Sequence, residues 1–328
     1  MRLSTGPRCG RVDSVRGSAG SYPKFLGPEL VPAPAPRARH SRRSPTSLTT
    51  VDYALGGTLV WMSRVALLGG GKMGAALVGG LLDGHWDADA LSIAEIDGER
   101  RAALEQQFPK VRVVPSAAWA VADADVVIVA VKPGDVEATL ATALPALGAD
   151  TLVLSIAAGV TMARLESFVP DRPVVRAMPN TPALVGLGAS AIAGGTHTTS
   201  EHLDLAERLL GFVGVVVRVN ESMLDAVTGL SGSGPAYIFL VAEAMIEAGV
   251  LVGLARDIST RLVVQTLLGS ATLLAQDASG PEALRAAVTS PGGTTAAGLR
   301  ELEAHGLRAA ILDAVSAATQ RSRELGAG

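Results

Sequence analysis

The segment Arg64-Val-Ala-Leu-Leu-Gly-Gly-Gly-Lys-Met-Gly74 decides the fold of the first half of this chain. Its first five residues form a short, mostly apolar run of strand length, and a helical pattern follows its last glycine. Gly69, Gly71 and Gly74 have the G-x-G-x-x-G spacing of a dinucleotide-binding turn between a strand and a helix. The first glycine permits the tight turn, the second lets the backbone approach a pyrophosphate, and the third lets the helix lie close to the strand. The unpaired N–H groups of the helix start would face the phosphates.

A carboxylate follows the next predicted strand, residues 91–94. Glu95 comes 21 residues after the last glycine of the turn, which is about where a carboxylate binds the adenosine ribose of NAD. Two arginines just downstream, Arg100 and Arg101, could instead receive the 2′-phosphate of NADP. A third interpretation is that Glu95 and Asp97 only cap the helix that follows them.

Strands and helices continue to alternate through the first half. The apolar runs at 124–130 and 151–156 are separated by a helical pattern, which favours a parallel sheet covered on both faces. Ligands of such sheets bind at the carboxyl ends of the strands, so Lys132 and the segment Ile156-Ala-Ala-Gly159 are expected to face the cofactor. Lys132 is equally compatible with a solvated loop. Asn180, in a rigid loop with two prolines, either faces the site or holds its own turn.

The second half is predicted to be helical almost throughout. Two of its helices begin at loops that combine glycine with hydroxyl side chains, at residues 231–237 and 290–295. Such a pair could bind a carboxylate, although capping alone would explain each loop. The apolar stretch Tyr237–Ala255 has the length of a membrane span but carries Glu243 and Glu247, so we expect a buried helix of a soluble protein.

Composition narrows the class of protein. The chain has 328 residues, of which 48% are hydrophobic and 18% charged, with a net charge of -3. These values suit a globular enzyme with two domains and argue against a nucleic-acid partner. Cys9 is the single cysteine, which excludes an internal disulfide and a cysteine-rich metal site and fits the cytoplasm. No lysine follows Lys132, and the histidines lack metal-ligand spacing. A nicotinamide enzyme without an evident acid–base residue should reduce an already activated bond, such as a protonated C=N.

The first 62 residues differ from the rest of the chain. They contain nine basic residues, three acidic residues and seven of the 18 prolines, without a sustained period of 2 or 3.6. We expect residues 1–61 to be a disordered extension, or an upstream stretch with Met62 as the natural first residue. A targeting segment is the alternative. A dinucleotide-binding domain over 62–222 and a helical domain over 223–328 would follow.

Six motifs, in this order, closely resemble the pyrroline-5-carboxylate reductase family. They are Gly69-x-Gly71-x-x-Gly74, Ala130-Val-Lys-Pro133, Ser155-Ile-Ala-Ala-Gly159, Arg176-Ala-Met-Pro-Asn-Thr-Pro182, Leu230-Ser-Gly-Ser-Gly-Pro-Ala-Tyr237 and Thr289-Ser-Pro-Gly-Gly-Thr-Thr295. The resemblance covers about residues 62–325. It implies reduction of 1-pyrroline-5-carboxylate to L-proline with NADPH or NADH, without a metal. It also implies an α/β Rossmann-type domain followed by an all-α dimerisation domain, in a dimer or a dimer-based ring such as a decamer.

The resemblance also assigns roles to residues. Thr295 would be the catalytic hydrogen-bonding partner of the ring nitrogen, in a loop that completes the site of a second subunit. The expected substrate-binding residues are Ser233, Ser290, Gly292, Gly293 and Thr294. The expected cofactor-binding residues are Gly69, Gly71, Lys72, Met73, Gly74, Glu95, Ala130, Val131, Lys132, Pro133, Ala157, Ala158 and Asn180.

Two departures leave details open. Where some relatives have a glutamate before the substrate loop, this chain offers Asp277, which either substitutes for it or leaves the contact absent. Where some relatives have a neutral polar residue, this chain has Glu95, which favours NADH, while the arginine pair leaves NADPH open. Competing functions are the reduction of another cyclic imine or keto acid, or dinucleotide binding without catalysis.

Overall fold

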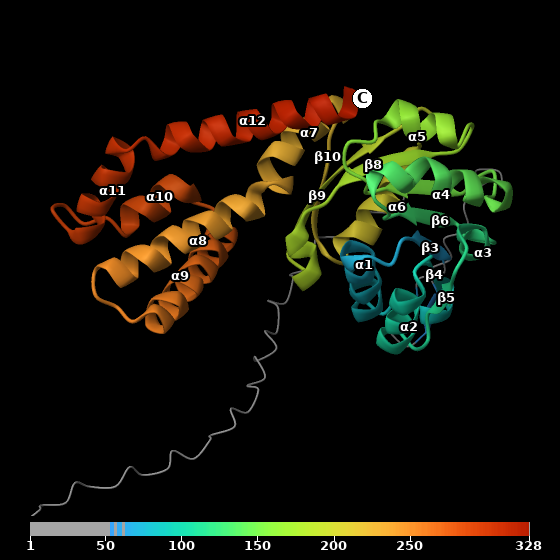
Figure 1. Ribbon diagram of the computed structural model, residues 1–328, viewed down its shortest axis with the longest axis horizontal. Helices are drawn as coiled ribbons and strands as arrows, with labels where there is room; N and C mark the ends of the chain where they lie inside the picture. Colours follow the sequence, from blue (N-terminus) through green and yellow to red (C-terminus); the bar gives the residue numbers. More distant parts are fainter. Residues whose placement is uncertain (1–52, 56–57, 61–62, 328) are drawn as a thin grey trace, which may run out of the picture. The chain divides into compact units, whose positions relative to one another are not determined.

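The structure is a computed structural model that describes residues 53–55, 58–60 and 63–327. Its centre is an eight-stranded sheet in the order β10-β9-β8-β7-β6-β3-β4-β5 (Figure 1). The strands are β3 (Val65–Leu68), β4 (Leu91–Ala94), β5 (Arg112–Val114), β6 (Val126–Val129), β7 (Leu152–Ser155), β8 (Val174–Met178), β9 (Gly188–Gly194) and β10 (Gly214–Arg218).

The sheet is parallel from β5 to β8, as the alternating pattern predicts, but β9 pairs antiparallel with β8. The prediction of a wholly parallel sheet is therefore wrong for the last two strands, β9 and β10. These two strands run parallel to each other. The reason is the short connection from β8 to β9, residues 179–187, whose only helical element is the 3-10 turn η4 (Thr181–Val185) and in which Gly186 has φ +74°. A parallel crossover needs about a dozen residues or more, usually with a helix.

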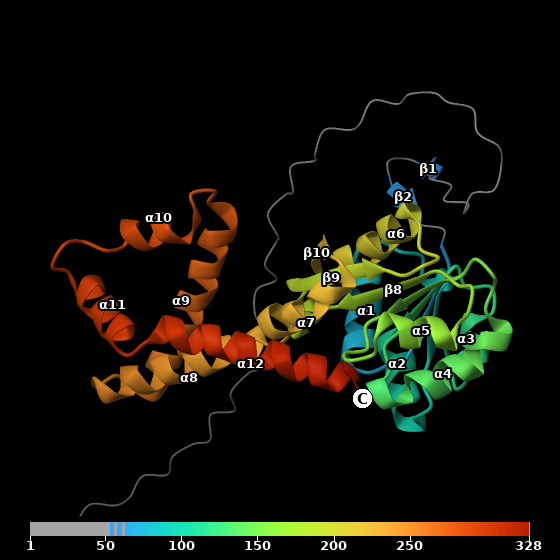
Figure 2. The same cartoon turned by 90° about the horizontal axis from the view of Figure 1, so that it is seen from above.

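Helices cover both faces of the sheet (Figure 2). Successive residues of β3 serve opposite faces, because Val65 and Leu67 pack in one core cluster and Ala66 and Leu68 in the other. The first cluster includes α1 (Lys72–Asp83), α2 (Gly98–Gln107) and α6 (Ser200–Gly211), and the second includes α3 (Ala117–Val121), α4 (Val136–Ala143) and α5 (Met162–Phe168). Short 3-10 turns add η1 (Ala88–Ala90), η2 (Pro133–Asp135) and η3 (Leu144–Ala146). Burial on both faces explains why the strands read as continuous apolar runs.

Helix α1 packs tightly against the glycine-rich turn. Its buried residues Gly74, Leu77, Val78 and Leu81 have the i, i+3, i+4, i+7 spacing of one helix face. A Cβ on Gly74 would collide with the carbonyl oxygen of Gly69, which itself has φ +105°. The two glycines are therefore required by close packing and by backbone conformation.

The chain becomes helical at η5 (Glu221–Met223), as the sequence pattern indicates. The elements that follow are α7 (Leu224–Val227), the π-helical turn η6 (Thr228–Gly232), α8 (Gly234–Leu251), α9 (Arg256–Gln276), α10 (Gly280–Ala287), α11 (Thr294–Ala304) and α12 (Leu307–Ala327). Helix α12 packs against α7 and η6, and Ser322 Oγ donates a hydrogen bond of 2.7 Å to Asp225 Oδ1. The division of the chain at residues 61/62 and 222/223 stays a prediction.

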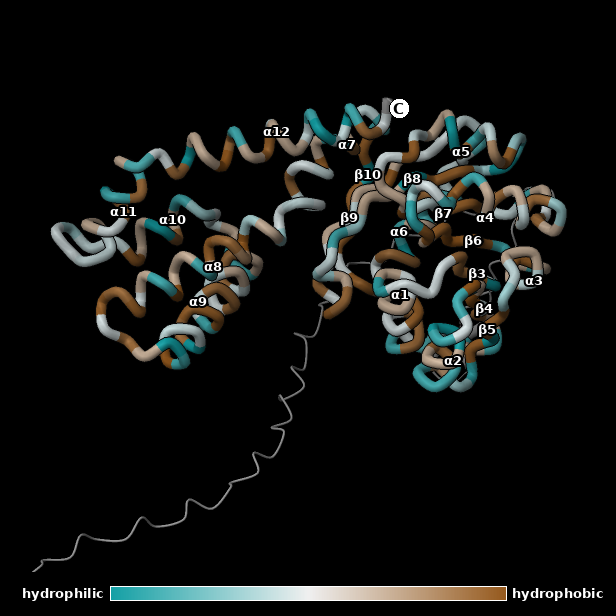
Figure 3. The backbone as a smooth tube through the Cα atoms, viewed as in Figure 1, coloured by the Kyte–Doolittle hydropathy of each residue, from teal (hydrophilic) through white to brown (hydrophobic). Residues whose placement is uncertain are grey.

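Helix α8 is not buried in the single chain, so the prediction of a buried helix at Tyr237–Ala255 is wrong for one chain taken alone. None of its residues is buried, and Phe239 and Leu240 are 65% and 66% exposed. Figure 3 shows the apolar character of α8 and α9. Two segments, Glu221–Leu251 and Arg256–Gln276, are long and apolar enough to cross a membrane by length and composition alone. Such segments also pass this test when they are helices of an interface between protein chains.

Part of the N-terminal extension has regular structure. Strands β1 (Tyr53–Leu55) and β2 (Thr58–Val60) pair antiparallel. The expectation of a disordered extension is therefore wrong for these six residues, because two short β-prone runs close together in the sequence are enough for antiparallel pairing. Residues 1–52, to which most of that expectation applies, lie outside the described residues.

Candidate cofactor and substrate site

A cavity of about 330 Å³ opens at the carboxyl ends of β6, β7 and β8, beside the start of α1. This is the edge at which parallel α/β sheets bind their ligands. The predicted cofactor residues that line it are Met73, Ala130, Val131, Pro133, Ala157, Ala158 and Asn180. The structure therefore brings together residues from four separate motifs, and most of them have small side chains.

Other lining residues were not singled out by the sequence. Met178 ends β8, Pro179 and Thr181 flank Asn180 after it, and Gly232 comes from η6. The signal for the first three was the Arg176–Pro182 motif, from which only Asn180 was selected, and the signal for Gly232 was the Leu230–Tyr237 motif, from which only Ser233 was selected. Spacing along the chain does not show which side of a loop faces a cavity.

The side chain of Asn180 connects the cavity to the second half of the chain. Its Nδ2 donates to the carbonyl oxygen of Ser231 at 3.0 Å, and its Oδ1 accepts from the N–H of Ala189 at 2.8 Å. Asn180 thus lines the cavity and also holds backbone. The link places η6, and Ser233 directly after it, next to the cofactor edge of the sheet.

Glu95 lies against the glycine-rich turn. Its carboxylate accepts from the N–H of Gly70 and from the N–H of Asp97, each at 3.0 Å. The side chain of Asp97 is the one that caps α2, by accepting from the N–H of Arg100 at 2.8 Å. The capping interpretation therefore holds for Asp97, while Glu95 holds backbone N–H groups of the glycine-rich turn and of the loop after β4, and its ribose role stays a prediction.

Both lysines of the predicted cofactor set are exposed. Lys72 is the first residue of α1, and Lys132 precedes η2. Neither lines the cavity, nor do Gly69, Gly71 and Gly74, which form the adjacent turn. The cofactor roles of these five residues, like those of the residues that line the cavity, stay predictions.

The predicted substrate loop does not line the cavity of its own chain. Within it, Gly292 has φ +69° and the N–H of Gly293 donates to the carbonyl oxygen of Ser290 at 3.0 Å. Thr294 begins α11, and Thr294 and Thr295 are exposed. The loop is thus preformed by its own backbone.

The carboxylate of Asp277 is hydrogen-bonded within its own turn. Its Oδ1 accepts from the N–H of Ser279 at 2.7 Å, and the side chain and backbone of Ser279 hold the pKa of Asp277 below its usual value. Within the chain it therefore acts as a turn residue between α9 and α10.

An ion pair that the sequence analysis missed joins β8 to η5, where the chain becomes helical. Arg176, 7% exposed, donates to Glu221 Oε1 at 2.9 Å, and the same oxygen accepts from the N–H of Met162 at 2.6 Å. The two charged residues are 45 positions apart, so no local pattern could pair them.

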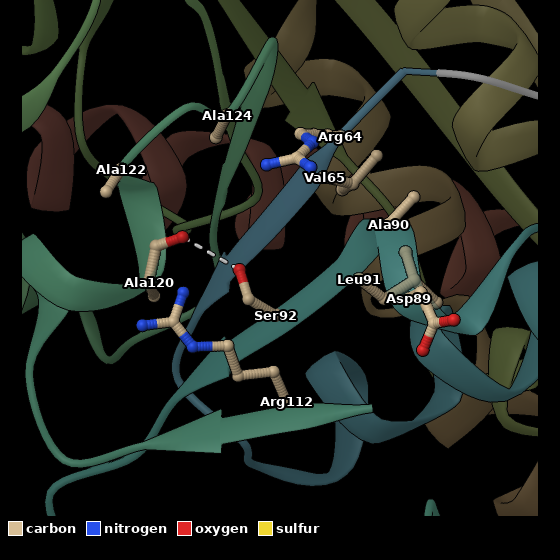
Figure 4. Close-up of a pocket in the computed structure, with 10 residues that line it drawn as sticks. All are labelled: Arg64, Val65, Asp89, Ala90, Leu91, Ser92, Arg112, Ala120, Ala122 and Ala124. Carbon is tan, nitrogen blue, oxygen red and sulfur yellow. Dashed lines mark hydrogen bonds between the residues drawn. The ribbon is translucent and has the colours of Figure 1, made fainter. Parts of the chain in front are cut away.

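A second cavity, of about 50 Å³, lies at the opposite, amino edge of the strands (Figure 4). Arg64 and Arg112 are among its lining residues, and Ser92 Oγ donates to the carbonyl oxygen of Ala120 at 2.8 Å. This space is far below the 300 Å³ or more of usual ligand pockets. Among the described residues there is no group of three or more His, Cys, Asp or Glu that could hold a metal ion.

Comparisons with known proteins agree with this geometry. A family model described as pyrroline-5-carboxylate reductase dimerisation matches residues 221–325, and one described as NADP oxidoreductase coenzyme F420-dependent matches residues 64–159. The pyrroline-5-carboxylate reductase of Mycobacterium tuberculosis (strain ATCC 25618 / H37Rv) is 47% identical over 291 residues, which covers 81% of this chain and 98% of the relative. That of Pseudomonas aeruginosa is 43% identical, with 80% and 96% covered.

Solved structures give the same result. A pyrroline-5-carboxylate reductase from Coxiella burnetii has a TM-score of 0.77 at 33% identity and covers 80% of this chain and 98% of its own. The Plasmodium falciparum pyrroline carboxylate reductase with NADP bound has a TM-score of 0.71 at 29% identity, with 81% and 98% covered. On these similarities and on the motifs gathered around its cavity, the chain belongs to the pyrroline-5-carboxylate reductase family.

Proposed function

We propose that this protein, as a pyrroline-5-carboxylate reductase, reduces 1-pyrroline-5-carboxylate to L-proline at the carboxyl edge of its sheet, the last step of proline biosynthesis. The observation that carries the proposal is the cavity itself. It joins small residues after three strands to Met73 in the first turn of α1, beside the glycine-rich turn, and Asn180 links it to the segment that ends at Ser233. The bound cofactor, NADH or NADPH, would supply the hydride for the imine carbon.

The residues of the turn fit a dinucleotide. A Cβ on Gly71 would meet only Arg100 Nη1, at 3.7 Å, so the space in front of this glycine is open to a ligand. The first N–H groups of α1, including those of Lys72 and Met73, have no partner one turn earlier in the helix and would bind phosphate oxygens. Ala157 and Ala158 would let the nicotinamide ring lie close to the backbone, and Lys132 would approach ribose or phosphate from the neighbouring loop.

The substrate side is supplied by two chains in this proposal. Ser233 lies beside Gly232, which lines the cavity of its own chain, whereas Ser290, Gly292, Gly293, Thr294 and Thr295 would come from a second copy. The exposed apolar side chains of α8 and α9, together with the dimerisation family model over 221–325, support this pairing. Assembly would give a dimer or a dimer-based ring such as a decamer.

The chemistry needs little from the protein beyond orientation. The cyclic imine accepts hydride at carbon when its nitrogen is protonated, so the Thr295 hydroxyl would hold the ring nitrogen. Backbone N–H groups of the loop and the hydroxyl of Ser290 would hold the carboxylate. The proposal includes no nucleic-acid or membrane partner and places the reaction in the cytoplasm, which the single cysteine, Cys9, fits.

The test is oxidation of NADH and NADPH, followed by absorbance, with and without 1-pyrroline-5-carboxylate, and with L-proline identified as the product. Substrate-dependent turnover supports the proposal. A folded protein that binds cofactor but reduces only other cyclic imines or keto acids would favour the first competing function. Binding without any turnover would favour a sensor.

The contribution of a second copy has its own test. The Gly71→Val chain should be nearly inactive, and the Thr295→Ala chain should keep about a tenth of wild-type activity or less. Co-refolded in equal amounts, they should regain roughly a quarter of wild-type activity, because half of randomly formed dimers are mixed and each mixed dimer has one intact site. If the loop serves its own chain, the mixture stays inactive.

A further inference from the structure

The carboxylate of Glu95 is fixed in one place by the backbone. Oε2 accepts from the N–H of Gly70 and Oε1 from the N–H of Asp97, both at 3.0 Å. A Cβ on Gly70 would lie 3.3 Å from Oε2, so the carboxylate packs directly on the glycine-rich turn. Each carboxylate oxygen has room for two hydrogen bonds. One acceptor position on each oxygen is therefore left for hydroxyl donors.

The two arginines that could offset this charge have different environments. Arg101 Nη1 donates to the carbonyl oxygens of Glu95 and Ile96, at 2.9 and 2.8 Å, and braces the loop after β4. The guanidinium of Arg100 has no hydrogen bond or ion pair with any residue that the structure describes. Its Nη1 lies in front of Gly71, 3.7 Å from the Cβ position of that glycine. Arg100 thus faces the part of the turn that a pyrophosphate approaches, and Arg101 is already engaged.

We infer that this enzyme binds NADH in preference to NADPH. The fixed carboxylate of Glu95 accepts hydrogen bonds from the ribose hydroxyls, while a 2′-phosphate, with a charge of about −1.5 to −2, is repelled by it. Arg100 serves the pyrophosphate, which both cofactors share, and so adds affinity without adding selectivity. This inference rests on the proposed function only in that the turn binds a dinucleotide. A charge conflict at such a distance is expected to weaken NADPH by roughly ten- to hundredfold.

The experiment measures the Kd of NADH and of NADPH by nucleotide fluorescence, without substrate, for the full chain. Wild type should bind NADH at least about tenfold more tightly. Glu95→Gln should lower that ratio by about tenfold or more, chiefly by tightening NADPH, because glutamine keeps an acceptor and loses the charge. Arg100→Ala should weaken both cofactors by a similar factor. The matched control is Glu99→Gln, a neutralised exposed carboxylate in the first turn of α2, which should leave the ratio within about twofold.

Three results would overturn the inference. These are equal or tighter binding of NADPH by wild type, an unchanged ratio in Glu95→Gln, or selective loss of NADPH in Arg100→Ala. Thermal melts of each variant separate a loss of fold from a loss of selectivity. The proposed reaction fails in a different way, since selective binding of NADH without turnover of 1-pyrroline-5-carboxylate would contradict it and still support this inference.

Discussion

Replacing Gly71 and Gly74 by valine should separate cofactor binding from folding within one turn. Gly71 has φ −66° and ψ −177°, an extended conformation that any residue adopts, and the nearest atom to its Cβ position is 3.7 Å away. The Gly71→Val chain should therefore fold with stability within about 1 kcal/mol of wild type. Its side chain would occupy the space in front of the turn. Loss of two charge-assisted hydrogen bonds to phosphate, at about 1.5–3 kcal/mol each, predicts at least hundredfold weaker cofactor binding.

Gly74→Val should act on the fold instead. A Cβ there collides with the backbone oxygen of Gly69 and lies 3.6 Å from the Cβ of Ala130. Since a backbone atom cannot rotate away, α1 would have to move off β3, at a cost of about 1–3 kcal/mol or more. Gly79→Val is the matched control in the same helix, because nothing lies within 4 Å of its Cβ position. Thermal melts and fluorescence titrations with NADH provide both readouts. Wild-type affinity in Gly71→Val would refute the assignment of this glycine.

Four further outcomes are expected. Thr295→Ala should lower kcat by about ten- to hundredfold with cofactor Kd unchanged, by steady-state kinetics and titration; unaltered kinetics would remove Thr295 from the site. Glu221→Gln should lower the free energy of unfolding by about 1–2 kcal/mol, which urea melts at pH 7 would measure. This loss is smaller than for a fully buried ion pair because the Glu221 side chain is 37% exposed. Burial lowers the pKa of His202 below its usual value, so the unfolded chain binds the proton more readily and stability should fall as pH drops below about 6.5. His202→Asn should flatten that slope. Deleting residues 1–61 should leave activity intact, and a dead or unfolded product would show that they belong to the fold.

The cofactor edge could be predicted from the sequence because its information is local. The turn is specified by three glycines at fixed spacing, with a strand before them and a helix after them. Parallel topology then brings Ala130 and Ala157 to the same edge of the sheet. The antiparallel return of β9 was missed because it depends on the length of a short loop. The Arg176–Glu221 pair was missed because it depends on how β8 and η5, whose paired residues are 45 positions apart, meet in the fold.

Helix α8 shows a different limit of sequence reasoning. Its pattern of apolar residues correctly predicts a surface that must be covered, but hydrophobicity carries no information about which chain covers it. The same limit applies to the Ser290–Thr295 loop, whose motif predicts a substrate loop without giving the cavity that it serves. In a single chain α8 packs against α9 but has no buried residue, and the loop lines no part of the cavity. A second copy of the chain, as proposed, would account for both, and the covering of α8 and the completion of the site would then be a single event.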